Sequence, residues 1–293
     1  MITHQNTQPQ KPARVVLLGA RGFIGAAIRH ELEAQQVPVL ALTSTDLNLD
    51  EALAAEKLAA VCNPTDTVVM LAALTPDKGR DIATLMKNLR IMQSVCTALE
   101  KTRCAQLIYF SSDAVYNTAI SCVTEDTPAS PQDLYGAMHY TREIMARSLA
   151  KVPVLVLRPT LVYGLADTHN SYGPNRFRRL AQKDGKITLF GGGEETRDHI
   201  HVEDVARLTV RCLLNQSVGT LNVATGVSKS FHEVAQITAK QFSNPVEVIT
   251  MPRNNPVTQR HYDVTNLIKA FPDFRFIAPD DGIARVHQES LKS

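Results

Sequence analysis

The chain has 293 residues, enough for one large α/β domain or two fused lobes. Its 31 basic and 29 acidic residues almost cancel, which argues against nucleic acid or an anionic membrane surface as the main partner. No apolar run approaches the roughly 20 residues of a membrane helix, and five scattered cysteines without metal-ligand spacing predict free thiols in a cytoplasmic protein that has no metal site.

Short β-branched runs alternate with helical stretches, a pattern typical of a parallel sheet wrapped by helices. The polar start, residues 1–12, predicts a short disordered tail rather than a secretory signal. Five compact apolar strands, buried on both faces, are then expected at 14–18, 38–42, 67–71, 106–111 and 154–157. Helices are expected between them at 24–35, 81–101 and 134–151. The predicted fold class is therefore α/β with a doubly wound parallel sheet.

A glycine-rich turn joins the first strand directly to the first helix, with Gly19, Gly22 and Gly25 in G-x-x-G-x-x-G spacing. Glycines let the backbone approach a pyrophosphate, and the helix N-terminus offers free N–H groups and a positive dipole end. In this strand–turn–helix setting the triplet predicts a Rossmann-type dinucleotide site, with Phe23 and Ile24 also at the cofactor.

The regular alternation stops after Arg158, where Gly, Pro and Asn become frequent and predict a smaller, irregular C-terminal lobe. A helix at 205–214 and a strand at 220–223 are regular enough to return to the first lobe. We therefore expect a dinucleotide-binding domain over 13–164, to which 198–224 returns, and a substrate-binding lobe formed by 165–197 and 225–293. Because no linker separates the two, they are expected to share one cleft.

Further motifs follow the glycine turn in a fixed order: Leu71-Ala72-Ala73, Ser111-Ser112-Asp113-Ala114-Val115-Tyr116, Tyr135-Gly136-Ala137-Met138-His139, Leu157-Arg158-Pro159-Thr160-Leu161-Val162-Tyr163-Gly164 and Arg197-Asp198-His199-Ile200-His201. This ordered set spans about nine-tenths of the chain and resembles the extended short-chain dehydrogenase/reductase family, of the NAD-dependent epimerase/dehydratase type. Most members of that family modify nucleotide-activated sugars. The resemblance implies a nicotinamide cofactor and a nucleotide-sugar substrate.

The resemblance also implies roles for four side chains. Tyr135 takes the place of the family's acid/base tyrosine, and Ser112 that of the hydroxyl that binds the same substrate oxygen. His139 stands where the family has lysine, one helical turn after the tyrosine and on the same face. With an ordinary pKa of about 6.5, it is expected to supply only partial positive charge, so activity should fall as the pH rises through the histidine pKa. Asp113 is either a further catalytic group or a strand-end cap.

The residue after Asp113 narrows the expected reaction. Related dehydratases carry a second acid there and GDP-fucose synthases carry a cysteine, whereas this chain has Ala114. Dehydration and epimerisation at C3 and C5 are therefore disfavoured. What remains is hydride chemistry, either 4-keto reduction or 4-epimerisation.

The end of the second strand bears on the choice of cofactor. Thr43 and Ser44 follow this strand, and the first acidic residue is Asp46. Small hydroxyls leave room for a 2′-phosphate, with which Arg21 in the glycine turn can pair, so NADP is favoured and NAD is the alternative. The family resemblance places further cofactor contacts at Leu71, Ala72, Ala73, Tyr135, His139 and Pro159.

By motif position, the substrate diphosphate is expected on Arg197 and Arg253, since arginines suit phosphates. Asn175 and Arg176 are expected to contact phosphate or sugar, and Thr188 and Phe190 to flank the nucleobase. Ser112 completes the substrate set.

Two questions stay open at this point. Because His139 replaces the lysine, the alternative to an enzyme is a non-catalytic NAD(P)-binding sensor or assembly protein on the same fold. Family members commonly dimerise through two helices, here 81–101 and 134–151, so a homodimer is expected, with Leu85, Met92 and Ile144 as exposed apolar contacts.

Overall fold

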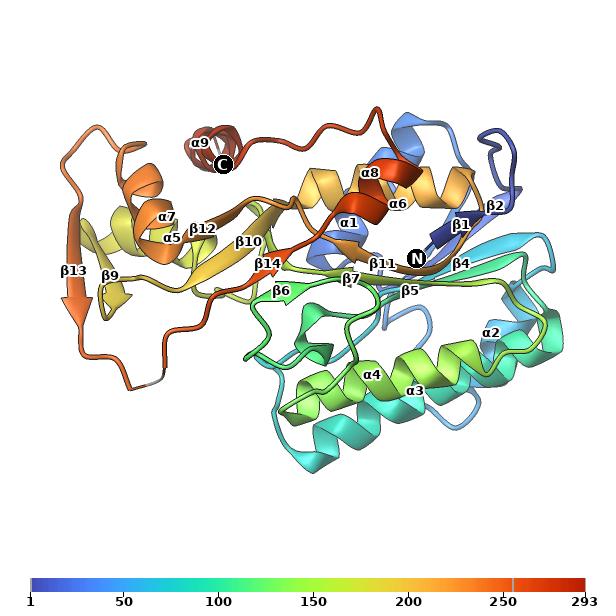
Figure 1. The fold of residues 1–293 in the computed structure, drawn as a ribbon. Helices are drawn as coiled ribbons and strands as arrows, with labels where there is room; N and C mark the ends of the chain where they lie inside the picture. Colours follow the sequence, from blue (N-terminus) through green and yellow to red (C-terminus); the bar gives the residue numbers. More distant parts are fainter. Residues whose placement is uncertain (1, 255, 293) are drawn as a thin grey trace.

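A computed structural model describes residues 2–254 and 256–292. At its centre lies a seven-stranded sheet in the order β1-β11-β7-β5-β4-β2-β3 (Figure 1). Its strands are β1 (Ile2–His4), β2 (Arg14–Leu18), β3 (Val39–Leu42), β4 (Asp66–Met70), β5 (Gln106–Phe110), β7 (Val154–Pro159) and β11 (Ser217–Val223). All neighbouring strands pair in parallel except β1, which is antiparallel to β11.

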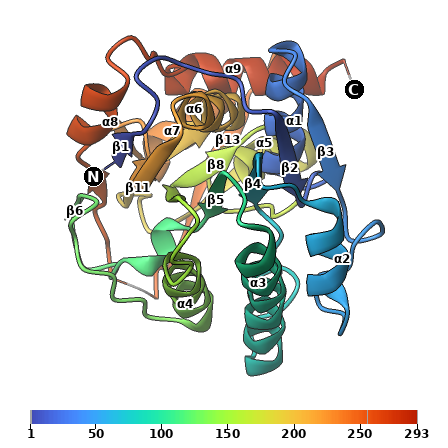
Figure 2. The same ribbon diagram turned by 90° about the vertical axis from the view of Figure 1, so that its right-hand side faces the viewer.

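Helices cover both faces of this sheet (Figure 2). On one face lie α1 (Phe23–Ala34) and α6 (Val202–Leu214), which bury Ile28, Leu32 and Leu208 against the strands. On the other lie α2 (Ala54–Val61), α3 (Ile82–Thr102) and α4 (Leu134–Arg147), which bury Leu58, Met92 and Ala146. The strands read as continuous apolar runs because both faces are covered. The expected doubly wound α/β fold is confirmed.

The prediction of a disordered N-terminal tail is wrong for residues 2–10, since backbone hydrogen bonds join residues 5, 6 and 10 to residues 214–216. Residues 2–4 form β1 on the edge of the sheet, where Ile2 is buried and His4 Nδ1 lies 2.8 Å from Ser217 Oγ. A three-residue strand is too short to show periodicity, and its pairing partner lies 213 positions away. Met1 is outside the described residues.

Beyond the main sheet, smaller elements form a second group with its own core. The three-stranded sheet of β8 (Leu161–Tyr163), β10 (Thr196–His201) and β12 (Ser228–Ser230) leads to the paired strands β9 (Lys186–Phe190) and β13 (Glu247–Met251). Around them pack α5 (Pro174–Asp184), α7 (Phe231–Ala239) and α9 (Pro279–Ser290). Helix α8 (Thr265–Ala270) instead packs Leu267 into the core of the main sheet. The exact division into lobes stays a prediction.

One C-terminal strand returns to the main domain. β14 (His261–Tyr262) pairs with β6 (Cys122–Val123), next to the short 3₁₀ helix η1 (Asp113–Val115) that follows β5. This crossing brings residues 260–262 to the carboxyl end of the sheet, where ligands of open α/β sheets bind.

All five cysteines are free thiols, and four of them are buried. In the part of the chain that the structure describes, no three His, Cys, Asp or Glu side chains are grouped as a metal ion would require. Over the same residues, no helix combines the length and apolarity needed to cross a membrane.

Candidate active site

The glycine turn has the geometry of a phosphate cradle. A Cβ on Gly25 would lie 2.3 Å from the carbonyl oxygen of Gly19, so only glycine lets α1 begin this close to the turn. Gly22 caps α1, and its own N–H donates to Gly19 O at 3.0 Å. Within the described residues no side chain caps this helix, which leaves first-turn N–H groups for an anion. The turn therefore fits the pyrophosphate of a dinucleotide, and Ala72 lies directly beside it.

The end of β3 carries one acid next to two hydroxyls. Asp46 folds back on Thr43, accepting its backbone N–H at 2.9 Å and its hydroxyl at 2.6 Å. These hydrogen bonds and the charge of Arg21 lower the pKa of Asp46. The sequence places this acid beyond the strand, whereas the turn brings its carboxylate back to the strand end. Arg21 and Ser44 are exposed here.

Helix α4 holds Tyr135 against the end of β5. Asp133 caps this helix by accepting the N–H of Gly136 at 2.8 Å. A Cβ on Gly136 would lie 2.2 Å from Ala114 O, so glycine allows α4 to pack directly on η1. Tyr135 lines a cavity of about 130 Å³ with Leu74 and Met138. The expected pairing of Tyr135 with the Ser112 strand end is thus built by local packing.

Burial raises the pKa of Tyr135 to about 12, and the negative charge of Asp113 adds to this increase. The Ser112 hydroxyl and the Arg142 guanidinium lower the pKa, but by less. The phenol is therefore fully protonated at neutral pH, so it is a proton donor before it is a base.

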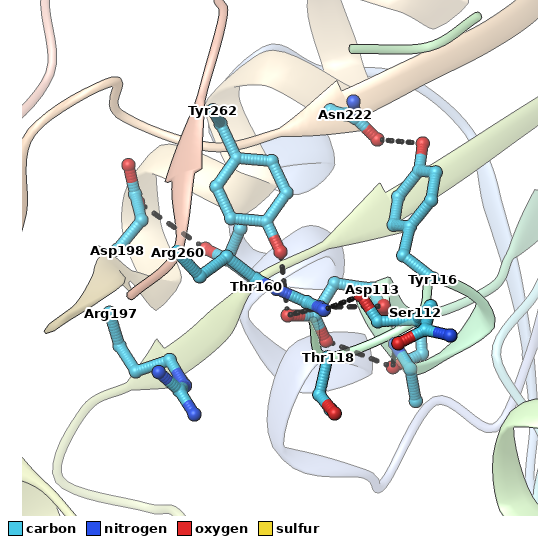
Figure 3. Close-up of polar contacts among 12 residues, drawn as sticks. Ser112, Asp113, Tyr116, Thr118, Thr160, Arg197, Asp198, Asn222, Arg260 and Tyr262 are labelled. Atoms are coloured by element: carbon cyan, nitrogen blue, oxygen red, sulfur yellow. Dashed lines mark hydrogen bonds and ion pairs between the residues drawn. The ribbon is translucent and has the colours of Figure 1, made fainter. Parts of the chain in front are cut away.

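Asp113 sits in a polar cluster that joins the two groups of elements (Figure 3). Its Oδ2 accepts the Tyr262 hydroxyl at 2.8 Å and lies 3.9 Å from the Arg260 guanidinium. Its Oδ1 accepts the Ser112 hydroxyl at 3.4 Å. Burial and Asp113 raise the pKa of Tyr262 well above its usual value. Sequence reasoning missed Arg260 and Tyr262, although they lie only seven and nine positions after Arg253.

A buried ionic network lies behind this end of the sheet. Glu143 accepts two hydrogen bonds from Arg158, at 2.8 and 2.6 Å, and one from the Ser111 hydroxyl at 2.6 Å. Arg158 also donates to Tyr116 at 2.7 Å, and Tyr116 donates to Asn222 at 2.7 Å. Glu143 also forms an ion pair with Arg147, one turn along α4, at 3.0 Å. The two buried charges are thus paired with each other and with further partners, so the network fixes β5, β7 and α4 together.

The expected substrate arginines occupy different surroundings. Arg197 donates to Thr258 O at 3.0 Å, and burial lowers its pKa. Arg253 donates to Phe190 O at 2.8 Å and pairs with Glu194. Both side chains are thus held in place by the protein before any ligand binds.

The remaining expected substrate residues lie on α5 and β9. Both ends of the Asn175 amide are engaged, by Gly164 N–H at 3.2 Å and by Asp167 at 2.9 Å. Arg176 is half-buried, with no ion pair among the residues described. Thr188 is half-buried and Phe190 is 42% exposed, beside the ring of Tyr172 at 5.3 Å between centroids.

Comparison with known proteins identifies the family of this chain. A model of the NAD dependent epimerase/dehydratase family matches residues 15–224. The chain belongs to this family. Among curated relatives, a dTDP-4-dehydro-6-deoxy-D-allose reductase of Streptomyces bikiniensis is 28% identical, over 86% of this chain and 89% of its own. The GDP-L-fucose synthase of Escherichia coli (strain K12) is 24% identical, over 96% and 97%.

Solved structures of similar proteins share the fold of this family member. A GDP-L-fucose synthetase from Naegleria fowleri bound to NADP has a TM-score of 0.87 at 18% identity, covering 98% of this chain and 96% of its own. A UDP-glucose 4-epimerase from Thermus thermophilus in complex with NAD has a TM-score of 0.80 at 22% identity, covering 94% and 98%. The family and fold expected from the sequence motifs are thus confirmed.

This member of the epimerase/dehydratase family carries a neutral histidine at position 139. His139 is 4% exposed, and burial together with the charge of Arg142 lowers its pKa to about 3. Its Nδ1 lies 2.9 Å from the Tyr109 hydroxyl, and its ring meets Tyr135 edge-on at 4.7 Å between centroids. The expectation that His139 supplies partial positive charge is therefore wrong. Activity should not fall through a histidine pKa near neutrality.

Proposed function

We propose that the protein is an NADP(H)-dependent reductase that acts on the 4-keto group of a nucleotide-diphosphate sugar. The observation that carries this proposal is the phenol of Tyr135, protonated at neutral pH and hydrogen-bonded to Ser112, which the close packing of α4 on η1 holds at the end of β5. Reduction of a ketone needs a proton donor at the developing alkoxide, which Tyr135 supplies. A 4-epimerase must use the same phenol first as a base and then as an acid, whereas a reductase needs only the proton donor, so the reaction product distinguishes the two activities.

Each residue of the site has a separate role in such a reduction. A nicotinamide cofactor, when bound on the glycine turn, supplies the hydride. Ser112 hydrogen-bonds the carbonyl oxygen and holds it towards the phenol. Tyr135 transfers its proton to the same oxygen, so that the product is a neutral alcohol rather than an alkoxide.

The relatives support this choice of substrate. A dTDP-4-dehydro-6-deoxy-D-allose reductase and a GDP-L-fucose synthase align over most of the chain. On the proposed substrate lobe, Arg197 and Arg253 hold the diphosphate, Phe190 and Thr188 flank the base, and Asn175 and Arg176 shape the sugar side.

An assay with purified protein tests the proposed reaction. NADPH and a dTDP-linked 4-keto-6-deoxy sugar are mixed with enzyme, and the absorbance of the reduced cofactor is followed while the product is identified by mass spectrometry. We expect loss of absorbance and a product two hydrogens heavier than the substrate. Conversion of a UDP-hexose into its 4-epimer without net cofactor consumption would instead identify an epimerase.

We propose NADP over NAD because Arg21 is exposed at the turn and suited to a 2′-phosphate. Arg21→Ala is expected to weaken NADPH binding by roughly 10- to 150-fold, the value of a charge-assisted hydrogen bond, and to leave NADH binding nearly unchanged. Isothermal titration calorimetry with both cofactors measures this. Asp46→Asn is the complementary variant. It removes the negative charge beside Arg21, so it should strengthen NADPH binding. Equal affinity of the parent protein for both cofactors would exclude the assignment.

We also propose a homodimer built on α3 and α4. Ile82 and Ile144 are 69% and 53% exposed on these helices. Of the contacts expected from sequence, Met92 is buried in the core and is not available, and Leu85 is half-buried. Light scattering should give twice the chain mass, and Ile144→Glu should shift it towards the monomer. A monomer mass for the parent protein across micromolar concentrations would contradict this prediction.

A further inference from the structure

Helix α4 buries a cation that the reaction described above does not use. Arg142 is 1% exposed and is the largest fully buried side chain among the residues described. It donates to Ala72 O at 2.9 Å and approaches Met138 Sδ at 3.7 Å, while its Nε has no partner in the described structure. Over the same residues, no carboxylate lies within ion-pair distance of it. A buried charge without a counter-charge is costly, so its retention calls for a physical reason.

The position of Arg142 connects it to the proton donor. Tyr135, His139 and Arg142 are spaced i, i+4, i+7 and share one face of α4. Long helical side chains lean towards the helix N-terminus, which directs the guanidinium towards His139 and Tyr135. The guanidinium carbon lies 5.2 Å from the centre of the Tyr109 ring, close enough for a cation–π contact.

Tyr109 links the cation to the histidine. Its hydroxyl lies 2.9 Å from His139 Nδ1, and His139 packs edge-on against Tyr135. The contacts thus run without a gap from Arg142 through Tyr109 and His139 to Tyr135. The guanidinium also holds the carbonyl of Ala72, whose backbone lies beside the glycine turn.

The charges around Tyr135 act in opposite directions. Asp113 favours the protonated phenol, whereas Arg142 favours the phenolate and so makes Tyr135 a stronger acid. The groups that face Arg142 are Tyr109 on β5, the Ala72 carbonyl after β4, the buried Cys96 thiol on α3, and Met138, His139 and Tyr135 on its own helix. A second cation at residue 139 would lie against the first in a low-dielectric interior, where like charges repel strongly.

We propose that Arg142 is a positioning residue that supplies the fixed positive charge behind Tyr135, and that this helix face has room for one cation only, which requires a neutral residue at position 139. The role given to Tyr135 rests on the proposed function. The single-cation site itself rests only on the burial and contacts of Arg142 and His139.

A double-mutant cycle tests the single-cation site through thermal unfolding, without any substrate. Arg142→Met keeps the length of the side chain and removes the charge, so it should fold and unfold at an equal or higher temperature than the parent. His139→Lys should lower the unfolding temperature of the parent. In the Arg142→Met background the same change should cause less than half of that decrease. As a control, Arg147→Met, which removes the other arginine of α4 and its ion pair with Glu143 at 3.0 Å, is expected to lower the unfolding temperature by itself but to leave the effect of His139→Lys unchanged. Equal decreases in the parent and Arg142→Met backgrounds would overturn the proposal.

Turnover with NADPH and a dTDP-linked 4-keto-6-deoxy sugar gives the second readout. Arg142→Met should lower kcat on the order of tenfold, the factor that corresponds to one pKa unit, with KM unchanged, and Arg142→Lys should retain most of the rate. His139→Lys should slow the parent but accelerate Arg142→Met. The same sign of effect in both backgrounds would also overturn the proposal. If the parent turns over no such sugar, the proposed function fails, and the unfolding cycle still decides on the cation site.

Discussion

Replacing Tyr135 with phenylalanine is expected to abolish turnover while leaving cofactor affinity nearly intact. The change removes the transferable proton but keeps the ring that packs edge-on against His139. Loss of a general acid lowers kcat by roughly 10²- to 10⁴-fold. Because Ser112 and the glycine turn are untouched, KM and the dissociation constant for NADPH should change little. Steady-state kinetics and a separate cofactor titration measure the two effects.

Tyr140→Phe provides a matched control for this experiment. Tyr140 is half-buried on the same helix, but it packs in the separate cluster with Val115 and Val123. The control should retain the parent kcat. A Tyr135→Phe enzyme within a few-fold of the parent rate would show that another group donates the proton, and Tyr262 would be the next residue to replace.

Glu143→Gln is expected to have the largest effect on stability. Glu143 is fully buried, and Arg158, with 5% of its side chain exposed, depends on it for two short hydrogen bonds. Removing one partner of a buried pair leaves an uncompensated charge, which costs about 3–5 kcal/mol. Denaturant unfolding followed by circular dichroism should show this loss as a lower midpoint with an unchanged slope.

The control for this change is an exposed pair on α1. Arg29 and Glu33 lie 3.4 Å apart with both side chains about half exposed, so Glu33→Gln should leave the free energy of unfolding nearly unchanged. Arg158→Met combined with Glu143→Gln should cost less than the two single changes added together, because neither charge is then left alone. A Glu143→Gln protein as stable as the parent would contradict this prediction, because it would show that the Arg158 guanidinium does not depend on the Glu143 charge.

The strands and helices of the main sheet could be predicted from the sequence because the patterns that mark them are local. The apolar run at Arg14–Leu18 matches β2 residue for residue, and the glycine spacing places α1 within one residue. Helix α2, with only eight alanine-rich residues, gave no periodic signal long enough to be seen.

The parts of the site that were missed come from pairings distant in sequence. Tyr262 and Arg260 meet Asp113 across 149 and 147 positions, through a two-residue strand that no composition reveals. Arg142 was not singled out because an arginine on an amphipathic helix is usually exposed. Only the packing of α4 on β5 shows that its charge is buried. The charge expected at His139 was wrong for the same reason, since burial sets its pKa.

The short strand β1 has a consequence for how molecules meet one another in concentrated solution. Without residues 2–4, the backbone N–H and C=O groups of β11 would lie unpaired along the sheet edge, an arrangement that invites edge-to-edge association with other chains. β1 is only three residues long and carries His4, which is tied to Ser217 and to the carbonyl of Ala270 at 3.2 Å. It pairs with residues 217–219 of β11 and offers almost no edge of its own, an arrangement that limits edge-to-edge association with other chains.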